Sequence, residues 1–518
     1  MDSVTSTRST ILLTSLLFAL CVGPVFISYQ PNVFTWDDAD YLVRAVAASR
    51  AFWSGDAHGL GAAMISQHTP VMTLLGLPWG PLSSRSAAGN CFVTLAAVIA
   101  LLAALSLYML LRMGVHPLFL IVAALCVLAS LGPYEPGARI PAGSALYSIH
   151  TVATGFMADS ILAWTTLAAV LLVPFEARTP CASTRSAILR GILCGAILSL
   201  GVMTKLSFLY FTLLIVPILF FTRCRYAGRR SAFVSLITLA VCSVPSIFYF
   251  VRYGRLALAQ ARGASFGGLA GFYHIPLVQF LGSMIRESPG LGCSALLMLA
   301  TLVYILMQGR LLHLWPEFVA LLITLGFLFI VLASPAKQNR YLFPVIVALP
   351  FLLAILVSRQ REATTSPPQA LSALAAFLVF LGLALAAVPT RHRPDWHSVS
   401  RADAVLAQAA RCDAKRIVLA TDSPTLNIYL MGLELEFSDS GASAITLAYQ
   451  AVSGIPIEED FRAMSEADMV VFQDARHINP KFSNQRVSEY ERYIRQRGGS
   501  AAIRVGDDIS IYSTRCAA

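Results

Sequence analysis

Blocks of apolar residues recur along most of this chain, each roughly 15 to 21 residues long, close to the roughly 20 that a helix needs to cross a membrane's hydrocarbon core. A chain of 518 residues that is 57% hydrophobic and only 13% charged is also too apolar for an ordinary soluble protein. A membrane β-barrel would alternate apolar and polar residues along its strands, which this chain does not do. The sequence therefore predicts an α-helical polytopic membrane protein.

The apolar blocks predict eleven membrane crossings. The first block follows Arg8, and no small-x-small cleavage site comes after it, so we interpret it as an uncleaved helix rather than a signal peptide. The eleven spans are expected at approximately 11–28, 91–111, 117–132, 159–175, 187–203, 206–222, 232–251, 291–309, 314–333, 341–357 and 370–389.

The positions of the arginines predict which side of the membrane each loop faces, because short cytoplasmic loops collect Arg and Lys. An N-terminus in the cytoplasm fits them best. Arg-rich clusters around residues 185 and 225 then require that 187–222 cross twice, as a hairpin that turns at Thr204-Lys205. A single kinked span is the alternative, but it would put the two clusters on opposite sides. The net charge of +10 is spread over many loops, so no nucleic-acid partner is expected.

Three larger loops are assigned to the outer side: 29–90, 133–158 and 252–290. The last of them has no strong periodic pattern, which indicates a loop rather than a helix. An odd number of crossings also places the C-terminal region outside. The chain thus divides into a membrane domain, 1–390, and an extracytoplasmic domain, 391–518.

The C-terminal domain is predicted to be a small α/β domain, because charged residues become frequent after residue 390 and the apolar runs shorten. An amphipathic helix is expected at 487–497. Short apolar runs lie at 417–420 and 469–472, and strands are expected at 502–505 and 509–512.

Eight of the ten cysteines lie in or beside apolar blocks, and no CxxC pair occurs, so a cysteine metal site is not expected. Cys412 and Cys516 lie in the polar C-terminal domain, where an oxidising compartment would allow a disulfide. A disulfide and two free thiols both remain open.

The stretch Trp36-Asp37-Asp38-Ala39-Asp40-Tyr41 holds three carboxylates within four residues. Their mutual repulsion would favour a proton or a bound divalent cation on at least one of them. A general base is one use of such a group. The alternative is a solvated acidic turn that caps a helix beginning near Tyr41, with Asp40 as the capping carboxylate.

The residues around this stretch resemble a motif of a known family. An apolar helix, a short spacer, Asp-(Asp/Glu)-x-x-Tyr, an amphipathic helix, Gly-Asp and a basic residue before Pro together resemble the first outer loop of the GT-C glycosyltransferases. The resemblance is to the group that contains the protein O-mannosyltransferases and the lipid A aminoarabinose transferases. Several members have Lys-Pro-Pro or His-Pro-Pro at the last position, whereas this chain has His68-Thr69-Pro70. The matching residues are Asp37, Asp38, Tyr41, Gly55, Asp56, His68 and Pro70.

Three further matches follow in the family's order. Met157-Ala158-Asp159-Ser160 resembles its second acidic site, Gly201-x-x-Thr204-Lys205 resembles its Gly-x-x-x-Thr-Lys turn, and Arg340-Tyr341-x-x-Pro344 resembles its Arg-Tyr-x-x-Pro signature. All of them fall on the predicted outer side. The resemblance covers roughly residues 10 to 350, and the C-terminal domain matches only in position and size.

The resemblance implies that residues 1–390 form a GT-C-like catalytic domain that transfers a sugar from a polyprenyl-phosphate carrier to an acceptor hydroxyl outside the membrane. Asp37 would be the general base, Asp38 its neighbour, and Asp159 would position the acceptor or the base. Lys205 and Arg340 would neutralise the leaving lipid phosphate, with His68 as a helper. One general base and a direct displacement imply inversion of the configuration at the anomeric carbon, since retention normally needs a second carboxylate that acts as a nucleophile.

Tyr41 and Tyr341 complete the implied substrate-binding residues, although Tyr41 could equally be an interfacial anchor. The family generally needs no metal or other cofactor, but a divalent cation at the acidic stretch stays open. A bacterial inner membrane and a lipopolysaccharide, other envelope glycan, lipid or protein acceptor are expected. The main alternative is a transporter or lipid flippase, whose ionisable residues would lie near the midplane of broken helices.

Overall fold

The computed structural model describes fourteen segments of the 518-residue chain. The predicted spans 11–28 and 370–389 and most of the loop 133–158 lie outside them. The described residues are 36–64, 70–131, 157–179, 183–266, 275–287, 289–307, 314–334, 338–362, 401–423, 426–438, 441–451, 453–474, 484–497 and 503–513.

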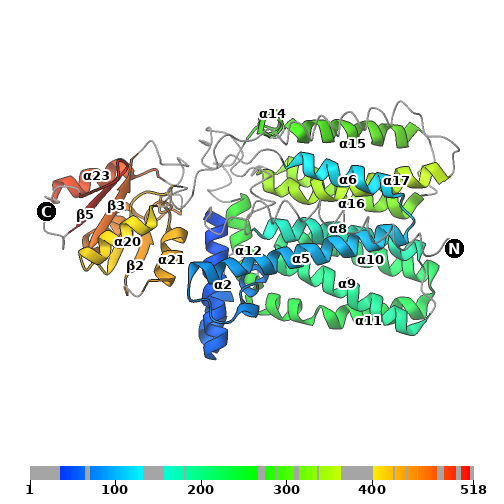
Figure 1. The fold of residues 1–518 in the computed structure, drawn as a ribbon, viewed down its shortest axis with the longest axis horizontal. Helices are drawn as coiled ribbons and strands as arrows, with labels where there is room; N and C mark the ends of the chain where they lie inside the picture. The colour runs from blue at the N-terminus through cyan, green and yellow to red at the C-terminus, as the bar shows by residue number, and fades with distance from the viewer. Residues whose placement is uncertain are drawn as a thin grey trace.

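A bundle of long helices makes up the larger part of the molecule (Figure 1). Within the described residues, seven helices are long and apolar enough to cross a membrane, and the bent pair α11 and α12, 48° apart, makes an eighth candidate. Helix α6 is apolar but shorter. The bundle helices are α5 (Arg85–Arg112), α6 (Pro117–Ser130), α8 (Ala158–Arg178), α9 (Thr184–Thr204), α10 (Leu209–Tyr226), α11 (Arg229–Cys242), α12 (Val244–Phe266), α15 (Pro289–Met307), α16 (Trp315–Ala333) and α17 (Phe343–Glu362).

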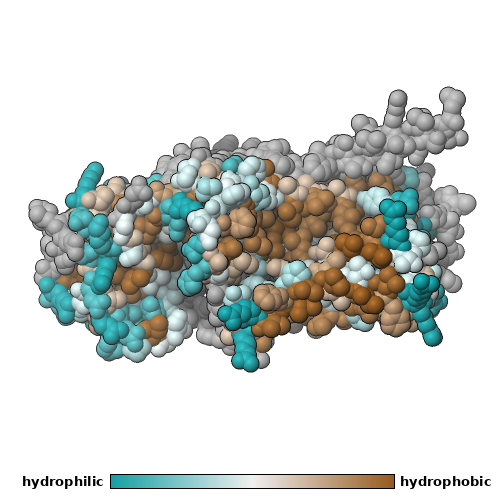
Figure 2. Space-filling view, turned by 90° about the horizontal axis from the view of Figure 1, so that it is seen from below, coloured by the Kyte–Doolittle hydropathy of each residue, from teal (hydrophilic) through white to brown (hydrophobic). Residues whose placement is uncertain are grey.

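Every predicted span that falls within the described residues coincides with one of these helices or with the bent pair. The helix-rich membrane fold is therefore confirmed. The predicted hairpin is also confirmed, because α9 ends at Thr204 and α10 begins at Leu209 after the short helix η2 (Leu206–Phe208). Figure 2 shows apolar side chains covering the bundle between more polar regions at its two ends, as expected for a surface that faces lipid.

Helix α8 forms the centre of the bundle, since its residues from Ala158 to Ala177 are all buried. It packs against α5, α9, α10, α16 and α17. A helix that is apolar all round and carries no polar face is expected in such a place. Its first turn carries Asp159 and its last turns carry Glu176 and Arg178, so its charges lie only at its two ends.

Two glycines bring α9 and α11 unusually close together. A Cβ at Gly191 would lie 2.7 Å from the backbone oxygen of Ser235, and one at Gly195 would lie 2.6 Å from Cys242 Cβ. Gly-x-x-x-Gly on one face of a membrane helix permits this close approach of backbones.

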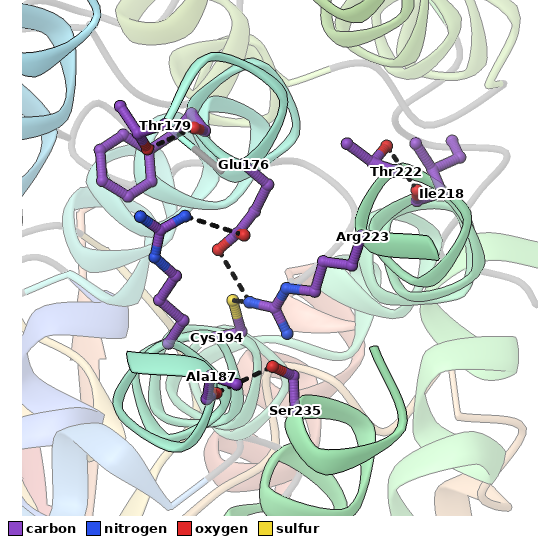
Figure 3. Close-up of polar contacts among 10 residues, drawn as sticks. Glu176, Thr179, Ala187, Cys194, Ile218, Thr222, Arg223 and Ser235 are labelled. Atoms are coloured by element: carbon purple, nitrogen blue, oxygen red, sulfur yellow. Dashed lines mark hydrogen bonds and ion pairs between the residues drawn. The ribbon is translucent and has the colours of Figure 1, made fainter. Parts of the chain in front are cut away.

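A buried charge cluster joins α8, α9 and α10 at the Glu176 end of α8 (Figure 3). Glu176 Oε1 accepts a hydrogen bond from Arg223 Nη2 at 2.8 Å, and its Oε2 accepts one from Arg190 Nη1 at 3.1 Å. The side chains of Glu176 and Arg223 are only 3% and 4% exposed. Arg223 Nη2 also donates to Cys194 Sγ at 3.2 Å. One carboxylate therefore ties three helices together.

We predict that Glu176→Gln lowers stability strongly, because it leaves two neighbouring arginines without their shared counter-ion. Removal of one partner of a buried ion pair typically costs about 3–5 kcal/mol. The unfolding temperature of the purified protein in detergent measures the effect. Glu466→Gln is the control, since Glu466 is exposed and lies 3.7 Å from Arg416. Equal shifts for the two variants would contradict this prediction.

Helix α2 (Trp36–Ser54) lies across one end of the bundle, between the bundle and the C-terminal domain (Figure 1). We call this the α2 end of the bundle. Three short helices follow: α3 (Ala57–Met64), α4 (Val71–Leu74) and η1 (Leu77–Trp79). Ser49 Oγ donates to Gly80 O, and Trp53 Nε1 donates to Leu77 O at 2.9 Å, so these segments fold back onto α2.

The expected start of this helix near Tyr41 is wrong, because α2 begins at Trp36 and the acidic stretch occupies its first turns. Asp40 does not cap the helix. It is buried inside it, and its Oδ1 accepts a hydrogen bond from Arg44 Nε at 2.9 Å. This i, i+4 pairing gives Asp40 a partner within the helix and so lets helix continue through the acids.

The expected loop 252–290 is also largely wrong. Helix α12 continues to Phe266, and α14 (Leu277–Glu287) follows it. On α14, Phe280 and Met284 are buried while Leu277, Val278 and Ile285 are exposed. The two buried residues are four positions apart, which is a helical spacing that the sequence interpretation overlooked.

The C-terminal domain contains a five-stranded sheet with the order β2-β1-β3-β5-β4. Strand β1 is parallel to β2 and β3, while β5 is antiparallel to β3 and β4. Strands at or near the two predicted positions, two more at the short apolar runs, and helix α23 confirm the α/β class. Its elements are α20 (Ala402–Arg411), β1 (Arg416–Leu419), α21 (Ile428–Glu436), β2 (Ser443–Thr446), α22 (Ile457–Glu466), β3 (Met469–Gln473), α23 (Val487–Gln496), β4 (Ile503–Val505) and β5 (Ile509–Ser513).

The sheet has a helical layer on each face. Ile417, Leu419 and Val471 belong to the apolar core on the side of α20 and α21, whereas Val418, Val470 and Phe472 pack with residues of α22 and α23. Cys412, directly after α20, is disulfide-bonded, while its expected partner Cys516 lies outside the described residues.

Candidate active site

Four residues that the sequence singled out meet at the α2 end of the bundle. Asp159 lies in the first turn of α8, and Lys205 lies between α9 and η2. Arg340 and Tyr341 belong to the short helix η4 (Asn339–Leu342), which leads into α17. The start of α8, the turn after α9 and the short helix η4 thus bring together residues that are far apart in the sequence.

The centre of the site is an ion pair. Lys205 Nζ donates to Asp159 Oδ1 at 2.5 Å. The Asp159 side chain is 1% exposed, whereas that of Lys205 is 23% exposed. The carboxylate is therefore enclosed by protein, and the ammonium group reaches partly to the surface.

Tyr341 links this pair to Arg340. Lys205 Nζ lies 5.0 Å from the centroid of the Tyr341 ring, and Arg340 Cζ lies 5.5 Å from the same centroid. Cations at such distances are attracted by the ring's electron-rich face. The ring thus keeps two positive side chains together, although they would otherwise repel one another.

Local structure explains why Lys205 points out of the helical hairpin. Its backbone is extended, with φ −159° and ψ 135°, so it interrupts the helix between Thr204 and Leu206. Gly201, one turn earlier, makes room for the Phe208 ring, which a Cβ at this position would overlap. The Gly-x-x-Thr-Lys pattern is therefore the sequence of a tight helical turn that presents a lysine.

Aromatic rings pack next to this turn and make it rigid. Phe208 and Phe211 have ring centroids 5.5 Å apart, and Phe211 lies 4.8 Å from Phe327 of α16. Tyr210 Oη donates to Ile323 O at 3.0 Å. Aromatic contacts of this kind add to the stabilisation from burial, so the position of Lys205 is well determined.

Acidic residues of α2 are the second part of the predicted site. The backbone of Asp37 and Asp38 lies in the first turn of α2, while their side chains are outside the described residues. Tyr41, one turn later, is buried on the inner face of the helix. His68 lies outside the described residues, so its predicted role remains a prediction.

Two polar side chains that the sequence did not single out lie buried in the same part of the fold. Gln338, two residues before Arg340, is 4% exposed, and its Oε1 has no hydrogen-bond partner in the described structure. The hydroxyl of Tyr249 on α12 is also buried without such a partner there. An isolated Gln or Tyr beside an apolar block matches no motif, so the sequence alone does not indicate that it lies near the site.

The chemistry of the described site is that of an anion receptor. Two partly exposed cations lie at the Tyr341 ring at the end of a helical bundle, and one of them is paired with a buried carboxylate. A guanidinium group binds a phosphate through two parallel hydrogen bonds, and an ammonium group adds a point charge. Within the described ranges, no group of three or more His, Cys, Asp or Glu side chains is placed to hold a metal ion.

No protein-family model matches the chain, and neither does any curated protein sequence. Solved structures do match. The crystal structure of ArnT from Cupriavidus metallidurans bound to undecaprenyl phosphate is 14% identical, with a TM-score of 0.55 over 98% of each chain, and the apo structure of that protein gives the same values. The Archaeoglobus fulgidus oligosaccharyltransferase, in complex with zinc and sulfate, is 14% identical over 89% of this chain and 67% of its own, with a TM-score of 0.49.

The likeness to ArnT extends over nearly the whole chain, including the C-terminal domain. It confirms the expected GT-C fold. At 14% identity the likeness is one of fold, and the function must be argued from the site itself.

Proposed function

We propose that this protein is an inverting glycosyltransferase that moves a sugar from a polyprenyl-phosphate carrier to an acceptor hydroxyl. The observation that carries the proposal is the ion pair of Lys205 with Asp159, held beside Tyr341 and Arg340 at the α2 end of the bundle. The GT-C fold supports it, because ArnT, which shares this fold, has been solved with undecaprenyl phosphate bound.

In this proposal Lys205 and Arg340 bind the phosphate of the carrier. As the bond between the sugar and the phosphate breaks, negative charge grows on the leaving oxygen, and fixed cations stabilise it most at that moment. Asp159 holds the Lys205 ammonium in place through the 2.5 Å hydrogen bond. Its proposed role is then to position a cation, which differs from the expectation that it positions the acceptor or the base.

Asp37 at the start of α2 is the proposed general base. It would take the proton from the acceptor hydroxyl as that oxygen attacks the anomeric carbon from the side opposite the phosphate. The new bond to the acceptor forms while the bond to the phosphate breaks, so the configuration inverts. Asp38 is its proposed neighbour, and Tyr41 and His68 are proposed to contact substrate.

A transporter fits the described charges less well. Transporters place ionisable residues near the membrane midplane, in broken helices. Here the charges of the central helix α8 lie at its two ends, and the interior positions between them carry no charge. An enzyme that works at one surface of the membrane is favoured by this distribution.

The proposed orientation has the α2 end and the C-terminal domain on the outer side of a bacterial inner membrane and the N-terminus in the cytoplasm. Arg223 and Arg225 at the end of α10 support it, because they lie at the opposite end of the bundle. The proposed acceptors are envelope glycans such as lipopolysaccharide, lipids or proteins.

Reconstitution tests the proposal directly. The purified protein in liposomes is supplied with a radiolabelled sugar on undecaprenyl phosphate and with an envelope fraction from a strain that lacks the protein. Label is expected to leave the carrier and to appear in a glycan, lipid or protein fraction. Label that stays on the carrier with every acceptor fraction would contradict the proposed function.

A further inference from the structure

Arg50, near the end of α2, joins three separate parts of the fold. Its Nε donates to Leu82 O at 2.7 Å, which connects α2 to the segment that precedes α5. Its Nη1 donates to Glu436 O at 2.6 Å and to Glu436 Oε2 at 3.0 Å, at the end of α21 in the C-terminal domain. The guanidinium carbon also lies 5.6 Å from the Phe437 ring centroid.

This arrangement uses two properties of arginine. The planar guanidinium group donates in several fixed directions, so one side chain can bind two segments at once. Glu436 ends α21, and a cation at the C-terminus of a helix is favoured by the helix dipole. A lysine could not make both sets of bonds, since it has one compact charged group.

Close packing on both sides of α2 accompanies these bonds. A Cβ on Gly432 of α21 would meet Val43 Cγ2 at 3.9 Å. Gly76 lies so close to α2 that a Cβ there would be 2.7 Å from Ala45 O. Helix α2 is therefore packed between the segment that precedes α5 on one side and α21 on the other, and Arg50 bonds to both sides.

The position of Arg50 along α2 lets a small tilt of the helix at Arg50 move the acidic stretch at its other end. It lies 13 residues after Asp37, which is about 20 Å along a helix. Over that length, a tilt of about 3° at Arg50 moves the backbone of Asp37 by about 1 Å. A misplacement of about 1 Å in a reacting group can cost about 100-fold in rate.

We infer that Arg50 is a positioning residue for sugar transfer, which holds α2 against the C-terminal domain so that the acidic stretch stays at the site. This inference rests on the proposed function, because it takes α2 as the carrier of the base. It gives the C-terminal domain a role in catalysis through the position of α2.

Stability and catalysis should respond differently to the loss of Arg50. The side chains of Arg50 and Glu436 are 33% and 34% exposed, and ion pairs this exposed contribute little to folding. Arg50→Ala is therefore expected to lower kcat about 10- to 100-fold while KM changes less than about 3-fold and the unfolding temperature changes little. Arg416→Ala, which removes an exposed arginine of the C-terminal domain, is the matched control and should leave kcat unchanged.

A cross-link provides the sharper test. Cysteines at Val43 and Gly432 would lie near one another, since a Cβ on Gly432 would be 3.9 Å from Val43 Cγ2. A disulfide needs Cβ atoms about 3.5–4.5 Å apart, so mass spectrometry first verifies that the bond has formed. The disulfide should restore kcat in the Arg50→Ala background, and a reductant should remove this rescue. The single-cysteine variants and the wild-type protein, treated with the same reductant, control for effects on the natural disulfide of Cys412.

The outcomes are distinct. Unchanged kcat in Arg50→Ala, or a loss that the cross-link does not repair, overturns the inference. If Arg50→Ala does not fold, the cross-linked protein with Arg50 intact provides the test. The inference expects this protein to transfer sugar at the normal rate. Loss of transfer that a reductant reverses would show that α2 must move away from the C-terminal domain, and would overturn the inference. A wild-type protein that transfers no sugar would instead overturn the proposed function.

Discussion

Replacement of Asp37 by asparagine is expected to reduce sugar transfer about 1,000-fold, because general base catalysis typically contributes about 10²- to 10⁴-fold. The asparagine side chain keeps the size of the aspartate but cannot accept the proton of the acceptor hydroxyl. Transfer of labelled sugar from undecaprenyl phosphate, in liposomes that contain equal amounts of folded protein, measures the loss.

The neighbouring acids provide internal controls for this experiment. Asp38→Asn should cost less, about 10- to 100-fold, since this residue is the proposed neighbour and not the base. Asp40→Asn should act mainly on stability, because Asp40 is buried and bonded to Arg44. Equal losses of transfer in all three variants, or normal transfer by Asp37→Asn, would remove Asp37 from its proposed role.

The second large effect is expected from Lys205→Met, which removes a cation from the proposed phosphate site. Loss of one group that stabilises developing charge typically costs about 10²- to 10³-fold in kcat. The variant should also be less stable, because Asp159 is 1% exposed and would lose the ammonium group bonded to it. Both the unfolding temperature and the rate of transfer are therefore expected to fall.

The double variant Asp159→Asn, Lys205→Met separates these two effects. Neutralising both members of the pair removes the buried unpaired charge, so much of the lost stability should return. Transfer should not return, because the phosphate site still lacks its lysine. Lys415→Met, at an exposed lysine of the C-terminal domain, is the surface control. Recovery of transfer in the double variant would show that Lys205 acts only through stability.

Much of the membrane fold was predictable from local sequence. Blocks of apolar residues give the spans because every backbone polar group must bond within its own helix inside the membrane. The positions of arginines then predicted the hairpin of α9 and α10. Both inferences need only the composition of short segments, which a single sequence contains.

The described part of the site was predictable for a different reason. Asp159, Lys205, Arg340 and Tyr341 come from three separate segments, and only their resemblance to motifs of one family indicated that they belong together. The structure brings all four into one cluster. Their assignment to the reaction, like that of Asp37, Asp38, Tyr41 and His68, remains a prediction for the experiments above to decide.

Pairings between distant residues could not be predicted. Arg50 and Glu436 are 386 residues apart, and nothing near either residue indicates the other. Arg190 and Arg223 belong to the two Arg-rich clusters that predict cytoplasmic loops, yet both bind the buried carboxylate of Glu176. The start of α2 was not predictable either, because three neighbouring acids indicate a turn, whereas Arg44 pairs with one of them inside the helix.

The central position of α8 has a consequence for how the protein is made. This helix emerges from the ribosome with Glu176 near its end, and the two arginines that neutralise it follow 14 and 47 residues later. The carboxylate has no partner until α9 has entered the membrane and lacks its second partner until α10 has, and a lone charge is costly to hold in lipid. Insertion of α8 into its final place should therefore wait for the synthesis of α10, so that the innermost helix of the bundle settles after α9 and α10 have been translated.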